Sequence, residues 1–307
     1  MTGSGGRLFV FAWHNVEGTH CFPNEPGRGA RQLGRQLDLL RRVATVVPLP
    51  DALRSLASGV PLPARAVALT FDDGYRDNLD AAVPLLERRG LPATFFLVPA
   101  MLSGRIGAWW ETLAWAASRT RRADVRWRGR TVPLDTPHRR RGWFDEAAER
   151  LKLTDRANRE RVVAEFVAAL DPAGQPPQGL FLDWDGARRL VERGFEVGSH
   201  SEFHAILAQE TADEQRRDLT DSRLALQREL GVAVDLLAYP NGRRSDFDDD
   251  TVDAARAAGY SFALTTMTGH NRPDTPPYEI RRACVWPHHG ALGVVAAVRH
   301  MMREARP

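Results

Sequence analysis

The chain has 307 residues, of which 43% are hydrophobic and 26% are charged, and its formal net charge is +3. These values indicate one large globular domain or two small ones with an ample core. All but one of the 42 basic residues are arginine, Lys152 being the exception, so the basic excess is weak evidence for a nucleic-acid partner.

Cysteine use and hydropathy bear on the compartment. Cys21 and Cys284 are the two cysteines, and their spacing fits neither a cysteine-based metal site nor a disulfide framework. A reducing compartment is the simpler interpretation. The apolar run at 8–13 is too short for a signal peptide or a membrane span, and no other run approaches that length. We therefore expect a soluble, cytoplasmic protein.

Strand-like and helix-like segments alternate along most of the chain. Short apolar runs ending at turn residues predict buried strands at 8–13, 45–49, 67–71, 93–98, 195–199, 236–239, 261–266 and 278–285. Helical spacing of apolar residues predicts helices at 31–42, 51–58, 78–89, 183–193, 212–230, 249–258 and 292–303. This alternation predicts parallel pairing, and six or seven such units without a dinucleotide-binding glycine pattern favour a barrel over an open sheet.

Residues from about 101 to 180 interrupt this alternation. Five of the eight tryptophans lie here: Trp109, Trp110, Trp115, Trp127 and Trp143. The segment 125–134 alternates around a glycine as in a hairpin, 159–170 is helical, and 171–179 is a proline- and glycine-rich linker. We predict a single domain over 1–307, with this tryptophan-rich insertion covering one face of the core.

Polar residues follow the predicted strands, and in a barrel the carboxyl ends of the strands share one rim. Asp72 and Asp73 follow one strand directly; two adjacent carboxylates resist joint ionisation, and a cation would offset that cost. His200 and His204 follow another strand, and on a helical backbone both imidazoles would face one way. Two imidazoles and a carboxylate form a three-ligand metal site with open positions for water and substrate.

Three segments resemble motifs of one family. Thr70-Phe71-Asp72-Asp73-Gly74-Tyr75 is similar to the first motif of the polysaccharide deacetylases, the NodB-homology group called carbohydrate esterase family four. His200-Ser201-Glu202-Phe203-His204 is similar to their second motif, and Ala238-Tyr239-Pro240-Asn241-Gly242 to a variant of their third. Their order and approximate spacing match the family, and the resemblance spans residues 8 to about 285, apart from the insertion.

The resemblance implies a distorted (β/α)7 barrel that removes acetyl groups from N-acetylated sugars with one divalent metal ion. Asp73, His200 and His204 would be its ligands. Zinc is the leading metal, and cobalt, manganese or nickel would also suit these ligands.

The family pattern also implies roles for other residues at the rim. Asp72 would be the general base that activates water, or alternatively a carboxylate that only orients a ligand. The backbone N–H of Tyr239 would help to hold the oxyanion, with Asn241 beside it at the substrate.

The chain departs from the family at the residue that supports the base. The third motif usually carries an arginine near Ala238, where this chain has a small residue. Arg281 or Arg282, at the end of the last predicted strand, would supply the same charge, and Arg282 is the favoured candidate.

The source of the general acid also departs from the family. The usual C-terminal leucine-histidine motif is not evident, and His288 and His289 do not match its register. His14 lies in a segment similar to the Tyr-His-x-Val of poly-N-acetylglucosamine deacetylases and is the better candidate, with a purely structural loop histidine as the alternative. His270 is a third candidate.

We therefore expect a metal-dependent amide hydrolase that releases acetate from an N-acetylamino sugar or its glycoconjugate. A cytoplasmic precursor, either nucleotide-linked, lipid-linked or free, is the expected substrate. Two alternatives remain: a deacylase of a non-sugar amide or formamide on the same metal centre, and a carbohydrate-binding relative without turnover. The tryptophans of the insertion either pack its core or form a lid that stacks on sugar rings.

Overall fold

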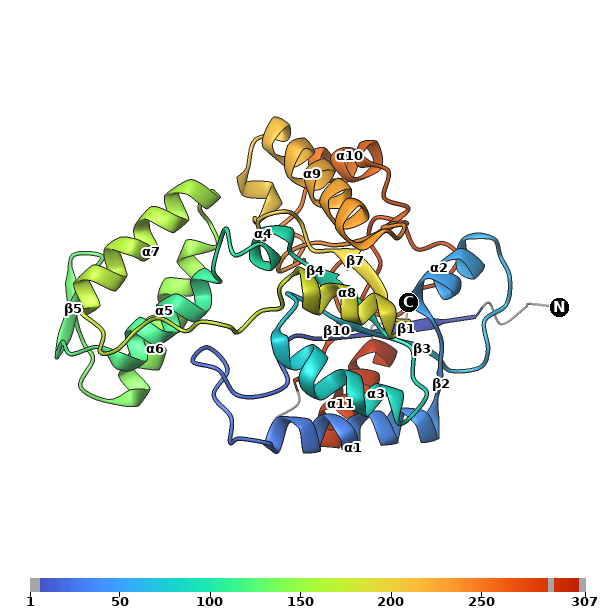
Figure 1. Cartoon of the computed structure of the whole chain (residues 1–307), viewed down its shortest axis with the longest axis horizontal. Coiled ribbons are helices and arrows are strands. Elements are labelled where there is room, and N and C mark those ends of the chain that lie inside the picture. The colour runs from blue at the N-terminus through green and yellow to red at the C-terminus, as the bar shows by residue number, and fades with distance from the viewer. Residues whose placement is uncertain (1–5, 287–289, 304–307) are drawn as a thin grey trace.

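A parallel sheet forms the centre of the molecule (Figure 1). The structure, a computed structural model, describes residues 6–286 and 290–303. Its main sheet has the order β10-β1-β3-β4-β7-β8-β9, with every neighbouring pair parallel, and the short β2 pairs with β3. The strands are β1 (Leu8–Trp13), β2 (Thr45–Val46), β3 (Ala66–Phe71), β4 (Thr94–Leu97), β7 (Glu196–Ser199), β8 (Leu236–Ala238), β9 (Phe262–Leu264) and β10 (Ala283–Cys284).

The sheet closes on itself. Ile280 bridges to Leu264 of β9, and the chain then continues into β10, which pairs with β1. The predicted distorted barrel is thereby confirmed. The strand predicted over 278–285 is shorter, because the side chain of Asn271 pairs with both the N–H and the carbonyl of Arg281 and takes the place of a neighbouring strand there.

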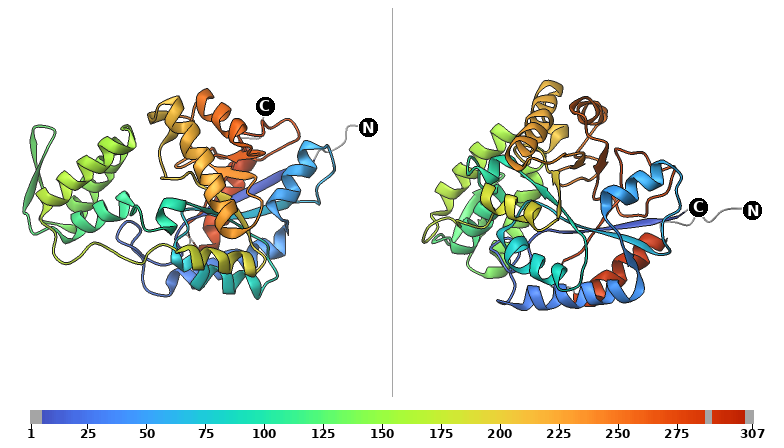
Figure 2. Two further views of the ribbon diagram at one scale, coloured as in Figure 1. Left: turned by 45° about the horizontal axis from the view of Figure 1, so that its top comes forward. Right: turned by 45° about the vertical axis from the view of Figure 1, so that its right-hand side comes forward.

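Helices cover the outside of the barrel. In Figures 1 and 2, α1, α3 and α11 lie together along one flank, and α9 packs beside α10 on another. Among the described residues, no helix has the length and apolar character needed to cross a membrane. The helices are α1 (Arg28–Val43), α2 (Leu49–Ala57), α3 (Val83–Glu87), α4 (Pro99–Leu102), α8 (Trp184–Glu192), η2 (Leu207–Gln209), α9 (Ala212–Leu230), α10 (Asp249–Ala258) and α11 (Gly290–Arg303).

The helix predicted over 78–89 is divided in two. It begins as a π-helical turn, η1 (Asn78–Ala82), and becomes α-helical only at α3. Pro84 explains the division, because a proline has no N–H to donate to the carbonyl four residues before it.

The side chains of β3 alternate between two hydrophobic clusters. Ala66 and Ala68 belong to the hydrophobic cluster inside the barrel, which also contains residues of α2. Val67 and Leu69 belong to the cluster between the sheet and the covering helices. Because strand side chains alternate in direction, Asp72 continues the inward series at the carboxyl end. The alternation along β3 thus places the carboxylate of Asp72 on the inner side of the barrel rim.

The insertion is a separate lobe beside the carboxyl ends of the strands (Figures 1 and 2). Its three helices pack mainly on one another and form their own hydrophobic cluster. The predicted hairpin is confirmed, and its turn consists of Arg128 and Gly129, both with positive φ. The lobe contains α5 (Trp109–Arg119), β5 (Asp124–Trp127), β6 (Arg130–Pro133), α6 (Pro137–Leu151) and α7 (Arg156–Leu170), of which α5 and α6 were not predicted.

Candidate active site

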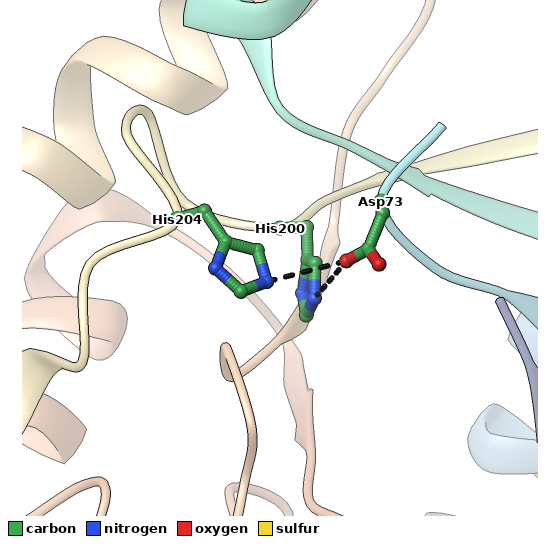
Figure 3. Close-up of side chains that lie close together, drawn as sticks. All are labelled: Asp73, His200 and His204. Carbon is green, nitrogen blue, oxygen red and sulfur yellow. Dashed lines mark ion pairs between the residues drawn. The ribbon is translucent and has the colours of Figure 1, made fainter. Parts of the chain in front are cut away.

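Asp73, His200 and His204 converge at the carboxyl ends of β3 and β7 (Figure 3). Oδ1 of Asp73 lies 3.3 Å from Nε2 of His200 and 3.2 Å from Nε2 of His204, and all three side chains are buried. Potential ligand atoms of the three residues lie within 4.8 Å of one another. The tertiary structure therefore brings together the three side chains that the family resemblance implied as metal ligands.

The loop between the two histidines is not the helix considered from their spacing. Ser201 and His204 have φ values of 63° and 51°, so the chain doubles back on itself. Asp218 of α9 holds this shape, because its carboxylate accepts the backbone N–H of Glu202 at 2.8 Å and of Phe203 at 3.3 Å. The imidazoles converge through this turn and not through helical periodicity.

Contacts behind the two imidazoles fix their orientation. His200 Nδ1 lies 2.7 Å from the carbonyl of Ala238 and donates to it, which leaves Nε2 free of a proton and directed at Asp73. The ring of His204 packs against the indole of Trp110, with 4.5 Å between centroids. Both rings thus present Nε2 to the same point.

The charges of this cluster fit a divalent cation. Burial opposes the ionisation of Asp73, yet the imidazoles of His200 and His204 beside its carboxylate hold its pKa well below the usual range. Burial also opposes protonation of His200, but Asp73 and Asp72 raise its pKa, so the cluster attracts positive charge. Tetrahedral ligands about 2.0–2.1 Å from zinc lie about 3.3–3.4 Å apart, close to the observed O–N separations. The residues present therefore fit a metal ion.

Asp72 and Arg282 form a buried ion pair inside the rim. Arg282 Nη1 donates to Asp72 Oδ1 at 2.8 Å and to Thr70 Oγ1 at 3.2 Å, and Nε donates to the carbonyl of Thr265 at 2.9 Å. Burial alone would raise the pKa of Asp72, but the charge of Arg282, followed by the nearby imidazoles, lowers it. Arg281 points elsewhere and donates to the carbonyl of Thr268. Of the two predicted arginines, Arg282 is thus the one that contacts Asp72.

The histidines considered as general acid lie in different places. His14 lines the same cavity as the metal-binding cluster, and its ring stacks on Trp286 with 5.1 Å between centroids and 14° between planes. His270 lies against Phe9, near the amino end of β1 and away from the rim. His288 and His289 lie outside the described residues. Among the described candidates, His14 is the one at the site.

Tyr239 does not offer the free N–H that the third motif implied. Its backbone N–H donates to the carbonyl of Leu264 at 3.0 Å, and its side chain stacks on Phe247. Asn241 takes a left-handed conformation with φ of 56°, lines the cavity, and has a buried Nδ2 with no hydrogen-bond partner among the described residues. The Asn241 amide is therefore a donor available near the cluster, whereas the Tyr239 backbone is not.

A buried carboxylate in the lobe connects three segments around the site. Glu111 is 1% exposed and accepts hydrogen bonds from Thr19 Oγ1 at 2.7 Å, the Cys21 N–H at 3.1 Å and the Tyr75 hydroxyl at 3.0 Å. Trp110 Nε1 donates to the same Tyr75 hydroxyl at 2.9 Å. Glu111 thus holds the N-terminal loop, the Asp-Asp-Gly-Tyr turn and α5 together.

The cavity at this site has a volume of about 520 Å³, and the insertion forms one of its walls. Trp109 and Trp110 line it, and Trp110 is itself buried against His204, so stacking on a sugar ring stays a prediction for these two. Trp115 and Trp143 are buried in the core of the lobe, and Trp127 packs on Trp143, which agrees with the packing interpretation. One face of α6 also lines the cavity. The helical spacing of residues in this segment was a signal for α6 in the sequence, but no helix was predicted there.

Comparison with known proteins agrees with this geometry. The sequence model of the polysaccharide deacetylase family matches residues 59–125 and 146–263, which is over half of the chain. YxkH of Bacillus subtilis (strain 168), a relative assigned to the polysaccharide deacetylases, is 21% identical over 223 residues, covering 73% of this chain and 52% of YxkH. The chain thus spans about half the length of the curated relative it matches.

Solved structures share the fold. Streptococcus pyogenes deacetylase PplD, in complex with acetate, superposes with a TM-score of 0.64 at 15% identity, over 96% of this chain and 99% of PplD. IcaB from Ammonifex degensii superposes with a TM-score of 0.60 at 20% identity, over 96% of this chain and 98% of IcaB. At these identities the likeness shows the barrel alone. Together with the family match, it leads to the conclusion that this chain belongs to the polysaccharide deacetylase family.

Proposed function

We propose that this protein is a metal-dependent amide hydrolase that removes the N-acetyl group from an N-acetylamino sugar or its glycoconjugate. The observation that carries the proposal is the convergence of Asp73, His200 and His204 beside the ionised Asp72, in a cavity at the barrel rim. Membership of the polysaccharide deacetylase family supports the same class of reaction.

Asp73, His200 and His204 would hold one divalent cation. Their one oxygen and two nitrogen donors favour zinc, and cobalt, manganese or nickel would also bind. Bound there, the ion would lower the pKa of a water molecule and polarise the carbonyl of the substrate.

The remaining residues handle protons and orientation. Asp72 Oδ1 accepts from Arg282, which leaves Oδ2 to take a proton from the attacking water. Asn241 Nδ2 would donate a hydrogen bond to the carbonyl oxygen as negative charge develops on it. The C–N bond breaks as the leaving nitrogen takes a proton from His14, and the products are acetate and a free amine.

Metal analysis combined with acetate release from N-acetylglucosamine oligomers tests this proposal. Bound metal with acetate release supports it. Bound metal without acetate from any N-acetylated sugar would instead support a deacylase of another amide. A protein that neither binds metal nor releases acetate would be a carbohydrate-binding relative without turnover.

A further inference from the structure

The cavity has two walls from different parts of the fold. Residues of the barrel rim, including Asp73, His200 and His204, line one side of it, and residues of the insertion lobe line another. The ribbon shows the lobe beside the carboxyl ends of the strands (Figures 1 and 2). Five residues at helical spacing on one face of α6 and the residue that caps its carboxyl end line the lobe side: Arg141, Phe144, Asp145, Ala148, Glu149 and Lys152. This helix therefore lies along the site with a continuous face toward the metal-binding cluster.

Side chains tie this face to segments outside the insertion at two points, in the loop after β1 and in the loop after β8. Near one end of the face, Arg141 Nη1 donates to the carbonyl of Cys21 at 2.6 Å. Near the other end, Arg243 donates from Nη1 to Glu149 Oε2 at 2.8 Å and from Nη2 to Glu149 Oε1 at 3.3 Å. At about 1.5 Å per residue, the two ties lie about 12 Å apart along α6. The two ties thus bound this stretch of the α6 face at both ends.

The Glu149–Arg243 tie is the weaker attachment of the lobe. Its side chains are 54% and 58% exposed, and ion pairs in such positions contribute little to stability. The attachment through Glu111, in contrast, is buried and hydrogen-bonded at both carboxylate oxygens. Arg243 also follows Asn241 by two residues, so this ion pair lies at the cavity close to the proposed carbonyl donor.

The pair remains charged across the working range of pH. The hydrogen bond from Arg243 lowers the pKa of Glu149 to about 2, and Lys152 donates to the same carboxylate at 2.7 Å. The carboxylate of Glu149 thus binds two cations at the cavity, Arg243 from the barrel and Lys152 from the carboxyl end of α6.

We propose that Glu149 and Arg243 are specificity-determining residues: their ion pair closes the cavity between α6 and the rim, and so favours short glycans over long ones. The inference rests on the proposed amidohydrolase function and adds the size of substrate that this site accepts.

Charge reversal tests the tie. We would measure kcat/KM for N-acetylglucosamine oligomers from monosaccharide to hexasaccharide with the metal-loaded wild type, R243E, E149R and the exchanged pair E149R/R243E. Each single variant should raise the ratio of hexasaccharide to monosaccharide kcat/KM by about two- to five-fold, the range expected for an exposed pair. The exchanged pair should return the ratio toward the wild-type value, though partly, because Lys152 would repel the new arginine.

A matched pair on the same lobe provides the control. Arg161 and Glu165 form an exposed ion pair on α7, outside the cavity lining. R161E and E165R should leave the length profile unchanged. Hydrogen exchange of residues 141–152 adds a readout independent of turnover: exchange should accelerate in R243E and return toward wild type in the exchanged pair.

A length profile that is unchanged in both R243E and E149R overturns the inference. A wild-type protein that binds metal but releases no acetate from any sugar overturns the proposed function instead, and the closing role of the pair is then decided by hydrogen exchange alone. Equal exchange of residues 141–152 in wild type and R243E would refute that role.

Discussion

Replacing Arg282 with methionine tests how the barrel supports Asp72. Arg282 is 0% exposed and Asp72 is 1% exposed, and the guanidinium lies 2.8 Å from the carboxylate. Methionine fills a similar volume but offers no donor. The variant therefore leaves a carboxylate buried without the cation that offsets its burial.

The expected magnitude follows from this burial. Removing one partner of a buried ion pair costs about 3–5 kcal/mol of folding free energy. In the wild type, the pKa of Asp72 is lowered, so its contribution to stability is present above the ordinary aspartate pKa of about 3.9 and is lost as pH falls through its folded value. Without Arg282, burial raises the pKa of Asp72 above the ordinary value, and the penalty then grows as pH rises.

Two measurements examine this reasoning. Urea unfolding near neutral pH should show R282M less stable by about 3–5 kcal/mol. The acidic limb of the kcat/KM profile should move to higher pH, because the base is protonated over a wider range. R281M is the matched control, since Arg281 donates to Thr268 and not to Asp72. D72N/R282M should recover part of the lost stability, because neither of the two substituted positions then carries a buried charge.

The reasoning would be refuted if the unfolding free energy of R282M were within about 1 kcal/mol of the wild-type value and the acidic limb of its kcat/KM profile lay at the wild-type pH. A protein that is destabilised but keeps the wild-type acidic limb would limit Arg282 to a structural role.

Three further predictions concern the metal-binding cluster, the leaving group and the loop of the histidines. D72N should abolish acetate release while binding one equivalent of metal as the wild type does, whereas D73A should lose the metal; loss of metal from D72N would place Asp72 among the ligands. H14A should slow turnover by about 10²–10⁴-fold, as expected for a general acid, and an unchanged rate would exclude His14 from proton transfer. Burial raises the pKa of Asp218 to about 7, so its folded form binds a proton that the unfolded chain releases above about pH 4. Stability should therefore fall by up to about 4 kcal/mol between pH 4 and 7, and D218N should flatten this slope in urea titrations; an equal slope in both proteins would contradict the assignment.

Much of the fold was predictable because its signals are local. Apolar runs such as 8–13 and 93–98 correspond to β1 and β4, and each ends at a turn residue that is readable in the sequence. The choice of Arg282 over Arg281 also has a local basis, since alternate residues of an extended segment face opposite sides.

Other features depended on long-range contacts. The turn at 200–204 takes its shape from Asp218, which lies on α9, so the spacing of the histidines alone could not decide the conformation between them. The N–H of Tyr239 is engaged by Leu264 of the neighbouring strand, and this could not be read from the third motif. The α6 face lacked any motif that would connect it to the site.

The sequence by itself determined which residues stand at the strand ends, because apolar periodicity and turn residues act over a few positions. The motifs at those ends were sufficient to indicate the three side chains proposed to bind the metal and the carboxylate proposed as the base. Only the tertiary structure decided which polar groups remain available and which helix faces them, because hydrogen-bond partners such as Leu264 and ion pairs such as Glu149–Arg243 join positions distant in the chain.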